Sequence, residues 1–118
     1  MNDVVVNKSF DFAIRIVKLN KYLVSEKGEY LLSKQIGRSG TSIGANITEA
    51  QQAQSAADFL SKMSIALKES KETEFWLKLL YKTDYIDAAQ YDSMNSDLSE
   101  IIKILVAICK TTKDKINN

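Results

Sequence analysis

The amino-acid sequence predicts an all-α protein, an antiparallel up-down four-helix bundle. Proline is absent from the 118 residues and there are only four glycines. Apolar residues recur at intervals of three and four, the period of amphipathic helices, and the scarcity of turn residues argues against many short strands. Hydrophobic residues make up 45% of the chain and charged residues 26%, the balance of a globular protein. We expect one domain, residues 1–118, around a single core.

The first helix is expected over residues 10–26. Ser9 lies where it could cap this helix, and Gly28 can adopt the left-handed conformation that ends helices. The apolar face consists of Phe12, Ile16, Leu19 and Leu23.

The second helix is expected over residues 30–52. Glycine costs about 1 kcal/mol relative to alanine inside a helix, so the three glycines at 37, 40 and 44 leave a short loop over residues 37–44 as the alternative. These glycines share one helix face with Ser33 and Thr48, which would let another helix approach closely. The apolar period continues through them and favours a continuous helix, with the stripe Leu32, Ile36, Ile43, Ile47 and Ala50.

Two capping signatures mark the starts of the third and fourth helices. Ser55 precedes Asp58 by three residues, and Asp87 precedes Gln90 by the same interval. The third helix is expected from Ser55 to Lys82, the fourth from Asp87 to Lys113. Short connections between helices of this length place neighbours side by side and antiparallel.

Two segments carry more apolar surface than one bundle can bury. Residues 75–81 include a single lysine among apolar and aromatic residues, and the apolar positions of residues 101–109 cover more than half of the helix circumference. Exposed apolar area of this extent indicates contact between copies of the chain; a membrane contact is disfavoured because no basic amphipathic face accompanies it. The residues expected in this oligomer interface are Phe75, Trp76, Leu79, Ile104 and Ile108.

The chain carries no signal for export or membrane insertion. The longest apolar run, residues 104–109, is too short to span a bilayer, and residues 1–12 lack the pattern of a secretory signal. The expected location is therefore the cytoplasm. The single cysteine, Cys109, cannot form an internal disulfide and is expected to pack as a small hydrophobic residue.

The sequence contains no complete set of catalytic residues. Histidine is absent, which removes the usual proton shuttle and the commonest metal ligand. Residues 40–44 spell G-x-S-x-G without the strand, sheet and histidine of a hydrolase, and residues 37–42 lack the spacing and lysine of a Walker loop. Glu69 and Glu72 are spaced as in a di-metal site, whose Glu-x-x-His motifs are missing. We expect no catalytic residue, cofactor, metal or small-molecule substrate.

The carboxylates of the third helix are expected to join a partly buried polar network with the second helix. A buried carboxylate without a partner costs several kcal/mol, so Arg38 is its expected partner. The network would fix register and assembly geometry. Its expected members are Arg38, Asn46, Glu49, Glu69 and Glu72.

Basic residues suggest a local anionic partner. The formal charge of +1 is too small for a general attraction to nucleic acid, so binding must be local. In an oligomer, the basic residues of several copies would together form a larger positive surface. The alternative is that these residues form an ordinary solvated face. The scarcity of exposed aromatic residues in the sequence argues against a base-stacking platform. The candidate nucleic-acid-binding residues are Lys68, Lys71, Lys78 and Lys82 on the third helix, with Arg15 and Lys18 on the first.

Several blocks of sequence together resemble one known family. They are KSFDFA at residues 8–13, QIGRSGTSIGANITEA at 35–50, DF at 58–59, IALKES at 65–70 and ETEFWL at 72–77. The chain is similar over nearly its whole length to the bacterial four-helix bundle proteins of the ribosomal RNA intervening-sequence family. Those proteins are named for reading frames within extra segments of large-subunit ribosomal RNA genes, and they are similar to the accessory variability protein of diversity-generating retroelements.

The resemblance implies a homopentamer without enzymatic activity. It also implies binding of RNA or DNA, or of a protein partner such as a reverse transcriptase, through a strongly basic surface, from which the net charge of +1 departs. Ser39 and Ser42 join the polar network on this ground. The family's signature positions fall here at Arg38, Ser39, Ser42, Asn46, Glu49, Glu69, Glu72 and Trp76.

Two functions follow as alternatives. The first is an oligomeric accessory protein associated with nucleic acid, and the second is an oligomeric scaffold that recruits a protein without touching nucleic acid. Binding to phosphates would weaken steeply with salt, whereas a scaffold would show little such dependence.

Overall fold

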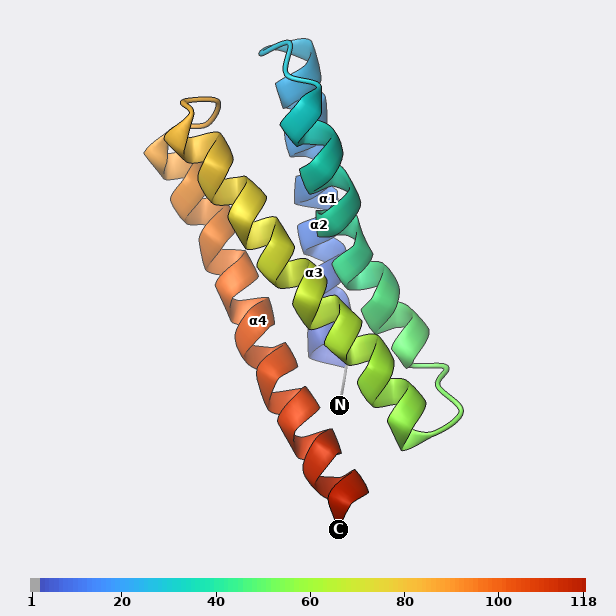
Figure 1. Cartoon of the computed structure of the whole chain (residues 1–118). Coiled ribbons are helices and arrows are strands. Elements are labelled where there is room, and N and C mark those ends of the chain that lie inside the picture. Colours follow the sequence, from blue (N-terminus) through green and yellow to red (C-terminus); the bar gives the residue numbers. More distant parts are fainter. Residues whose placement is uncertain (1–2) are drawn as a thin grey trace.

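The computed structural model describes residues 3–118, which form four α-helices: α1 Asp3–Ser25, α2 Leu31–Ala50, α3 Ala56–Lys82 and α4 Ala88–Asn117. The helices run alternately up and down (Figure 1), which confirms the predicted antiparallel bundle. The molecule is a rod of 50 × 21 × 20 Å. Because α1 and α3 each pack on α2 and α4 but not on each other, they occupy diagonally opposite corners. No helix in this part of the chain has the length and hydrophobicity needed to span a bilayer.

The core contains residues of all four helices, and in α4 its buried residues end at Leu105. Half-buried side chains, including Cys109, pack against it, as expected for this cysteine. The largest fully buried side chains come from all four helices: Phe12, Ile16, Leu23, Ile36, Ile43, Ile47, Met63, Leu77, Leu80, Leu98, Ile101 and Leu105.

The first helix begins earlier than the sequence indicated. Its first residue is Asp3, and Ser9 lies inside it, fully buried, with its hydroxyl donating to the carbonyl of Val6 at 3.0 Å. The predicted start and the predicted cap at Ser9 were therefore wrong. Val5 is only 1% exposed, so core packing extends the helix through a β-branched segment of modest intrinsic propensity.

The second helix is continuous through its glycines, so the alternative of a loop over residues 37–44 is excluded. A Cβ atom on Gly40 would lie 2.7 Å from side-chain atoms of Ile16, and one on Gly44 would lie 3.2 Å from the backbone oxygen of Ser9. These glycines therefore let α1 approach α2 closely, as the small-residue strip predicted.

The turn between α1 and α2 combines a predicted glycine with a carboxylate that sequence reasoning missed. Gly28 has a φ of 62°, the left-handed conformation expected of it. The Glu29 carboxylate accepts hydrogen bonds from the backbone amides of Leu31, Leu32 and Ser33 at 2.7–3.1 Å. It thereby satisfies the free amides of the first turn of α2.

The starts of α3 and α4 follow the predicted caps with one difference. Ser55 accepts from the Asp58 amide at 3.0 Å, but the Asp58 carboxylate accepts from the amide of Gln54 instead of Ser55. Asp87 and Gln90 form the complete reciprocal capping box, with both bonds at 2.8 Å.

Candidate nucleic-acid interface

The four predicted lysines of α3 lie in one exposed row. We call the row Lys68, Lys71, Phe75, Lys78 and Lys82 the lysine face; every member is exposed. Residues three and four apart share a helix face, and the buried residues of α3 point the opposite way, into the bundle. The sequence prediction placed the lysines together correctly, but it did not place Phe75 among them.

The ammonium groups of this face have few intramolecular partners. Within residues 3–118, Lys68, Lys78 and Lys82 form no ion pair, and Lys71 reaches only Glu74, at 3.9 Å. An exposed pair at that distance contributes little to stability and is screened by salt. The lysine charges therefore remain available to an external anion.

Two carboxylates of α3 beside the lysine face are bonded to Arg38 of α2. The Arg38 guanidinium lies 3.3 Å from both oxygens of Glu69 and also hydrogen-bonds Glu72. Glu72 in addition accepts a hydrogen bond from the indole nitrogen of Trp76 at 2.9 Å. This part of the predicted polar network is present, and it links α2 to α3.

These contacts shift the pKa values of Glu72 and Arg38. The indole hydrogen bond of Trp76, followed by the bond from Arg38, lowers the pKa of Glu72 below its ordinary value, because both donors favour the ionised carboxylate. The same contact with Glu72 raises the pKa of Arg38. Glu72 is therefore a carboxylate at neutral pH, which makes it unsuited to act as a general acid there.

Other members of the predicted network do not reach those carboxylates. The Ser42 hydroxyl bonds the carbonyl of Arg38 at 2.7 Å and the Asn46 amide bonds that of Ser42 at 2.9 Å, both within α2. Glu49 pairs with Lys62 of α3 at 2.7 Å. Because α2 and α3 are antiparallel, each further turn along α2 moves away from Glu69, which is why these predicted contacts were wrong.

A hydrogen bond between two buried hydroxyl groups adds a contact for which the sequence had indicated only one partner. The hydroxyl oxygens of Ser39 and Thr73 lie 2.9 Å apart, and both residues are fully buried between α2 and α3. Ser39 was an expected network residue, whereas Thr73 was missed. A polar residue at a core position of a helical period was the signal that could have identified it.

The predicted oligomer interface is partly used by the subunit itself. Trp76, Ile104 and Ile108 are half-buried and pack against the core, and Leu79 is also half-buried. Phe75 is 59% exposed, and its ring meets that of Trp76 edge to face at a centroid distance of 4.9 Å. Of the five residues, Phe75 alone presents most of its side chain to solvent.

Sequence reasoning missed a second apolar row on α1. Phe10, Ile14 and Val17 are 65%, 42% and 46% exposed, and their spacing of four and three places them on one face. We call these three residues the α1 stripe. Beside it, Phe10 and Ala13 line an apolar groove of about 380 Å³ with Thr41, Gly44, Ala45 and Thr48 of α2. The signal was a second helical period, offset by two residues from the core residues Phe12 and Ile16.

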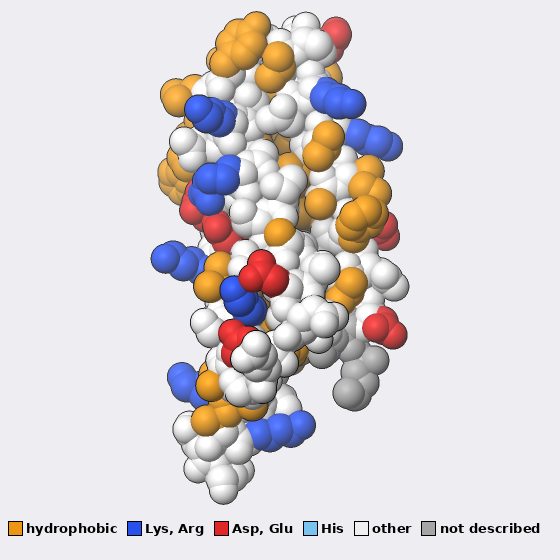
Figure 2. Space-filling view, turned by 90° about the vertical axis from the view of Figure 1, so that its right-hand side faces the viewer, with side chains coloured by type: hydrophobic (Ala, Val, Ile, Leu, Met, Phe, Trp, Pro, Cys, Tyr) orange, Lys and Arg blue, Asp and Glu red, His pale blue; other side chains and the backbone are white. Residues whose placement is uncertain are grey.

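The two surfaces lie on opposite sides of the molecule. In Figure 2, α2 faces the viewer, with α3 on the left and α1 on the right. Basic and acidic side chains gather along the left of this view, and hydrophobic side chains are prominent on the right.

The predicted basic pair on α1 does not extend the lysine face. Arg15 reaches across to α4, where it contacts Asp97 at 2.6 Å and the Ser93 hydroxyl at 2.8 Å. Lys18 is exposed and lines a shallow pocket between α1 and α4 together with Arg15. Since α1 lies diagonally opposite α3, the structure brings Arg15 and Lys18 together with each other but not with the four lysines.

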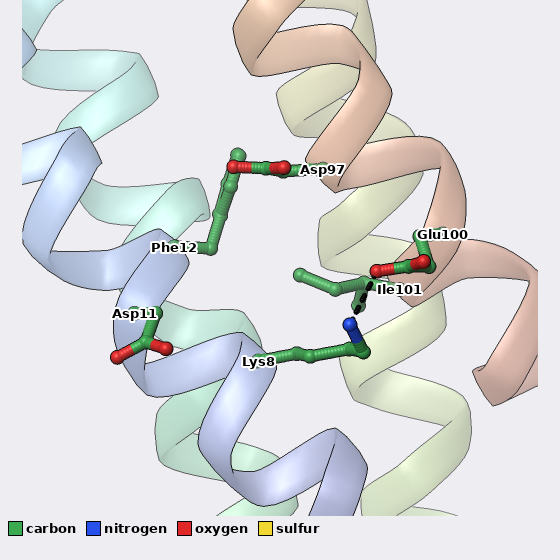
Figure 3. Close-up of a pocket in the computed structure, with 6 residues that line it drawn as sticks. All are labelled: Lys8, Asp11, Phe12, Asp97, Glu100 and Ile101. Atoms are coloured by element: carbon green, nitrogen blue, oxygen red, sulfur yellow. Dashed lines mark hydrogen bonds and ion pairs between the residues drawn. The ribbon is translucent and has the colours of Figure 1, made fainter.

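The seam between α1 and α4 encloses a small cavity of about 140 Å³ (Figure 3). Lys8 crosses it to Glu100 at 2.5 Å, which raises the pKa of Lys8, while Asp11 stays on the α1 side. Phe12 and Ile101 form its apolar wall. Within residues 3–118, no three His, Cys, Asp or Glu side chains are arranged to hold a metal ion. The seam is an ion-paired helix contact.

Comparisons with known proteins place the chain in a family. Residues 1–107 match the model of the 23S rRNA-intervening sequence protein family. The fold is similar to a crystal structure of a protein with unknown function from the S23 ribosomal protein family of Bacteroides thetaiotaomicron, with a TM-score of 0.91 and 60% identity, covering 92% of this chain and 97% of that one. No match was found among curated proteins. The chain belongs to the 23S rRNA-intervening sequence protein family.

Proposed function

We propose that this chain is a non-enzymatic accessory protein of the cytoplasm that forms a homo-oligomer and binds RNA or DNA through the lysine face of α3. The observation that carries the proposal is the row of four exposed lysines, beside which Glu69 and Glu72 are both bonded to Arg38, whose single positive charge offsets one of their two negative charges. A local positive surface thus exists on a chain whose formal charge is only +1.

Assembly strengthens such a surface. Each added copy contributes another row of lysines, so a single nucleic acid can contact several rows at once. A pentamer, the state implied by the resemblance, would carry five rows. Association through multiple weak sites on one nucleic acid gains affinity without any new kind of contact.

The α1 stripe is the surface that we assign to self-association. Phe10, Ile14 and Val17 leave a hydrophobic row in water beside an apolar groove, and burial of apolar area drives association. Phe75 is less suited to a contact between copies, because the flanking lysines of two like faces would repel each other. The α1 stripe also lies diagonally opposite the lysine face, so association there leaves α3 accessible.

A salt-dependent binding measurement tests the function. Fluorescence anisotropy with labelled ribosomal RNA and duplex DNA at two salt concentrations gives the slope of log affinity against log salt. If four phosphates are neutralised by one lysine face, the slope is about −3 to −4. The double variant Lys71→Gln/Lys78→Gln should reduce its magnitude by about 1.4–1.8.

A matched control separates this face from general charge. Lys21→Gln/Lys34→Gln removes the same charge from exposed positions on α1 and α2, and it should leave the slope nearly unchanged. Absence of binding at low salt would contradict the proposal. The remaining function would then be an oligomeric scaffold that recruits a protein, such as a reverse transcriptase, through its apolar surfaces.

A further inference from the structure

Phe75 lies in the middle of the lysine face and is exposed, whereas the sequence had indicated too few exposed aromatic residues for base stacking. Its side chain is 59% exposed, and Lys71 and Lys78 lie one turn away on either side. Lys68 and Lys82 continue the row, which spans about 21 Å at 1.5 Å per residue. The order of residues along the lysine face is therefore two lysines, an aromatic ring, and two lysines.

The Phe75 ring is held in place by a chain of contacts. It packs edge to face on Trp76, with an interplanar angle of 76°, and the Trp76 indole nitrogen donates to Glu72. Glu72 is in turn bonded by Arg38 of α2. The polar network between α2 and α3 thus fixes the tryptophan on which the exposed phenylalanine rests, so little entropy would be lost when a ligand contacts the ring.

We propose that Phe75 is a stacking platform for an unpaired base of a single-stranded nucleic acid whose phosphates lie on the flanking lysines. This inference rests on the nucleic-acid binding proposed above and specifies its substrate class. Aromatic side chains interleaved with basic ones are the combination that single-strand binding uses, because every base has a π face and the backbone is charged.

Duplexes fit this surface poorly. Bases inside a duplex are stacked on each other, so a side chain on a convex helix cannot reach their faces, and the major groove of A-form RNA is too deep and narrow to be read. The lysine face also has no Arg, Asn or Gln that could read base edges in the major groove of DNA. A duplex would contact the lysines but leave Phe75 without a partner.

The test compares a single strand and a duplex on one set of variants. Anisotropy is measured with a short uridine-rich RNA and a blunt RNA hairpin, at two salt concentrations. Phe75→Leu keeps an apolar side chain and removes the π face, and Phe75→Trp keeps a stacking ring. Tyr30→Leu, on an exposed aromatic residue at the start of α2 that belongs to neither the lysine face nor the α1 stripe, is the control.

We expect Phe75→Leu to weaken single-strand binding by about 5- to 100-fold, with the salt slope and the hairpin affinity unchanged, because stacking is largely independent of ionic strength. Phe75→Trp should restore the affinity, and Tyr30→Leu should not change it. Trp76, the only tryptophan of the chain, provides a second readout. Its emission should change on binding the single strand and not on binding the hairpin.

The other outcomes are distinguishable. If Phe75→Leu binds the single strand as tightly as the wild type while Lys71→Gln/Lys78→Gln weakens it, stacking is overturned and the nucleic-acid function stands. If the wild type binds neither RNA at low salt, both proposals fail. If Phe75→Leu instead lowers the oligomer mass measured by light scattering, Phe75 belongs to a subunit contact and the stacking proposal is overturned.

Discussion

A single arginine organises the polar surface between α2 and α3. Arg38 is half exposed, yet it bonds two carboxylates of α3. One of them, Glu72, also accepts a hydrogen bond from the indole nitrogen of Trp76. Exposed ion pairs stabilise a fold only weakly, so we assign this cluster a positioning role more than a stabilising one. Its measurable consequences are a pH dependence and the orientation of the aromatic pair.

Acidification should reveal the lowered pKa of Glu72. Its folded-state pKa lies below the unfolded value near 4.5, so the stabilisation is complete at neutral pH and is lost as pH falls through the folded pKa. We expect the melting temperature of Glu72→Gln to fall less than that of the wild type between neutral pH and about pH 3. Parallel curves for the two proteins, measured by circular dichroism, would contradict the assignment.

Two glycines of α2 should respond differently to alanine. Gly40→Ala places a Cβ against three atoms of Ile16 in the core, so we expect a loss of about 1–2 kcal/mol despite the better helix propensity. Gly37→Ala meets only the end of the Asn20 side chain, at 3.0 Å, and should stay within about 0.5 kcal/mol of the wild type. Urea unfolding measures both, and equal losses would refute the close approach at Gly40.

At the scale of the elements, two turns use the left-handed conformation with different residues. Gly28 adopts it at a φ of 62°, whereas Asp84, after α3, adopts it at 67° with a side chain. Tyr85 and Asp84 then donate their amides to the carbonyls of Leu80 and Tyr81, which ends α3 in a Schellman motif.

These turns predict opposite effects of substitution. Gly28→Ala should destabilise the protein by about 1 kcal/mol, although no atom lies near the new Cβ, because alanine resists the left-handed conformation. Asp84→Gly should stabilise it by roughly 0.5–1 kcal/mol for the same reason. Thermal unfolding of both variants checks the signs, and a stabilising Gly28→Ala would be incompatible with the observed backbone.

Helices were predictable wherever a local signal marked their limits. The capping residues Ser55 and Asp87 placed the starts of α3 and α4, and the isoleucine period carried α2 through its glycines. The start of α1 was missed because burial of Val5 depends on α1 packing against the bundle, which no local pattern reports. Glu29 was missed for a related reason, since its cap depends on the chain turning at Gly28.

At the scale of the whole molecule, the lysine face and the α1 stripe lie on helices at diagonally opposite corners of the bundle. The candidate site was predictable in its lysines and in the Arg38 contacts, because helical spacing determines which residues share a face. Asn46 and Glu49 were misplaced because the register of α2 against α3 depends on packing along the entire interface. The exposure of Phe10 and Phe75 likewise depends on which faces neighbouring helices leave open.

Disruption of the α1 stripe should change the oligomeric state. Phe10→Asp places a charge in the hydrophobic row, and burying an unpaired carboxylate at an interface is strongly unfavourable. We expect a lower mass in light scattering with the helical circular dichroism spectrum retained. Val106→Asp makes the same change at an exposed position on α4 and should leave the mass unaltered. An unchanged mass for Phe10→Asp would remove α1 from the interface.

The diagonal placement of α1 and α3 has an evolutionary consequence. A helix that contacts only α2 and α4 can vary its outer residues without altering the face of the helix opposite. If the chain assembles through α1 and binds through α3 as proposed, substitutions along α3 would change the ligand without disturbing the contact between copies.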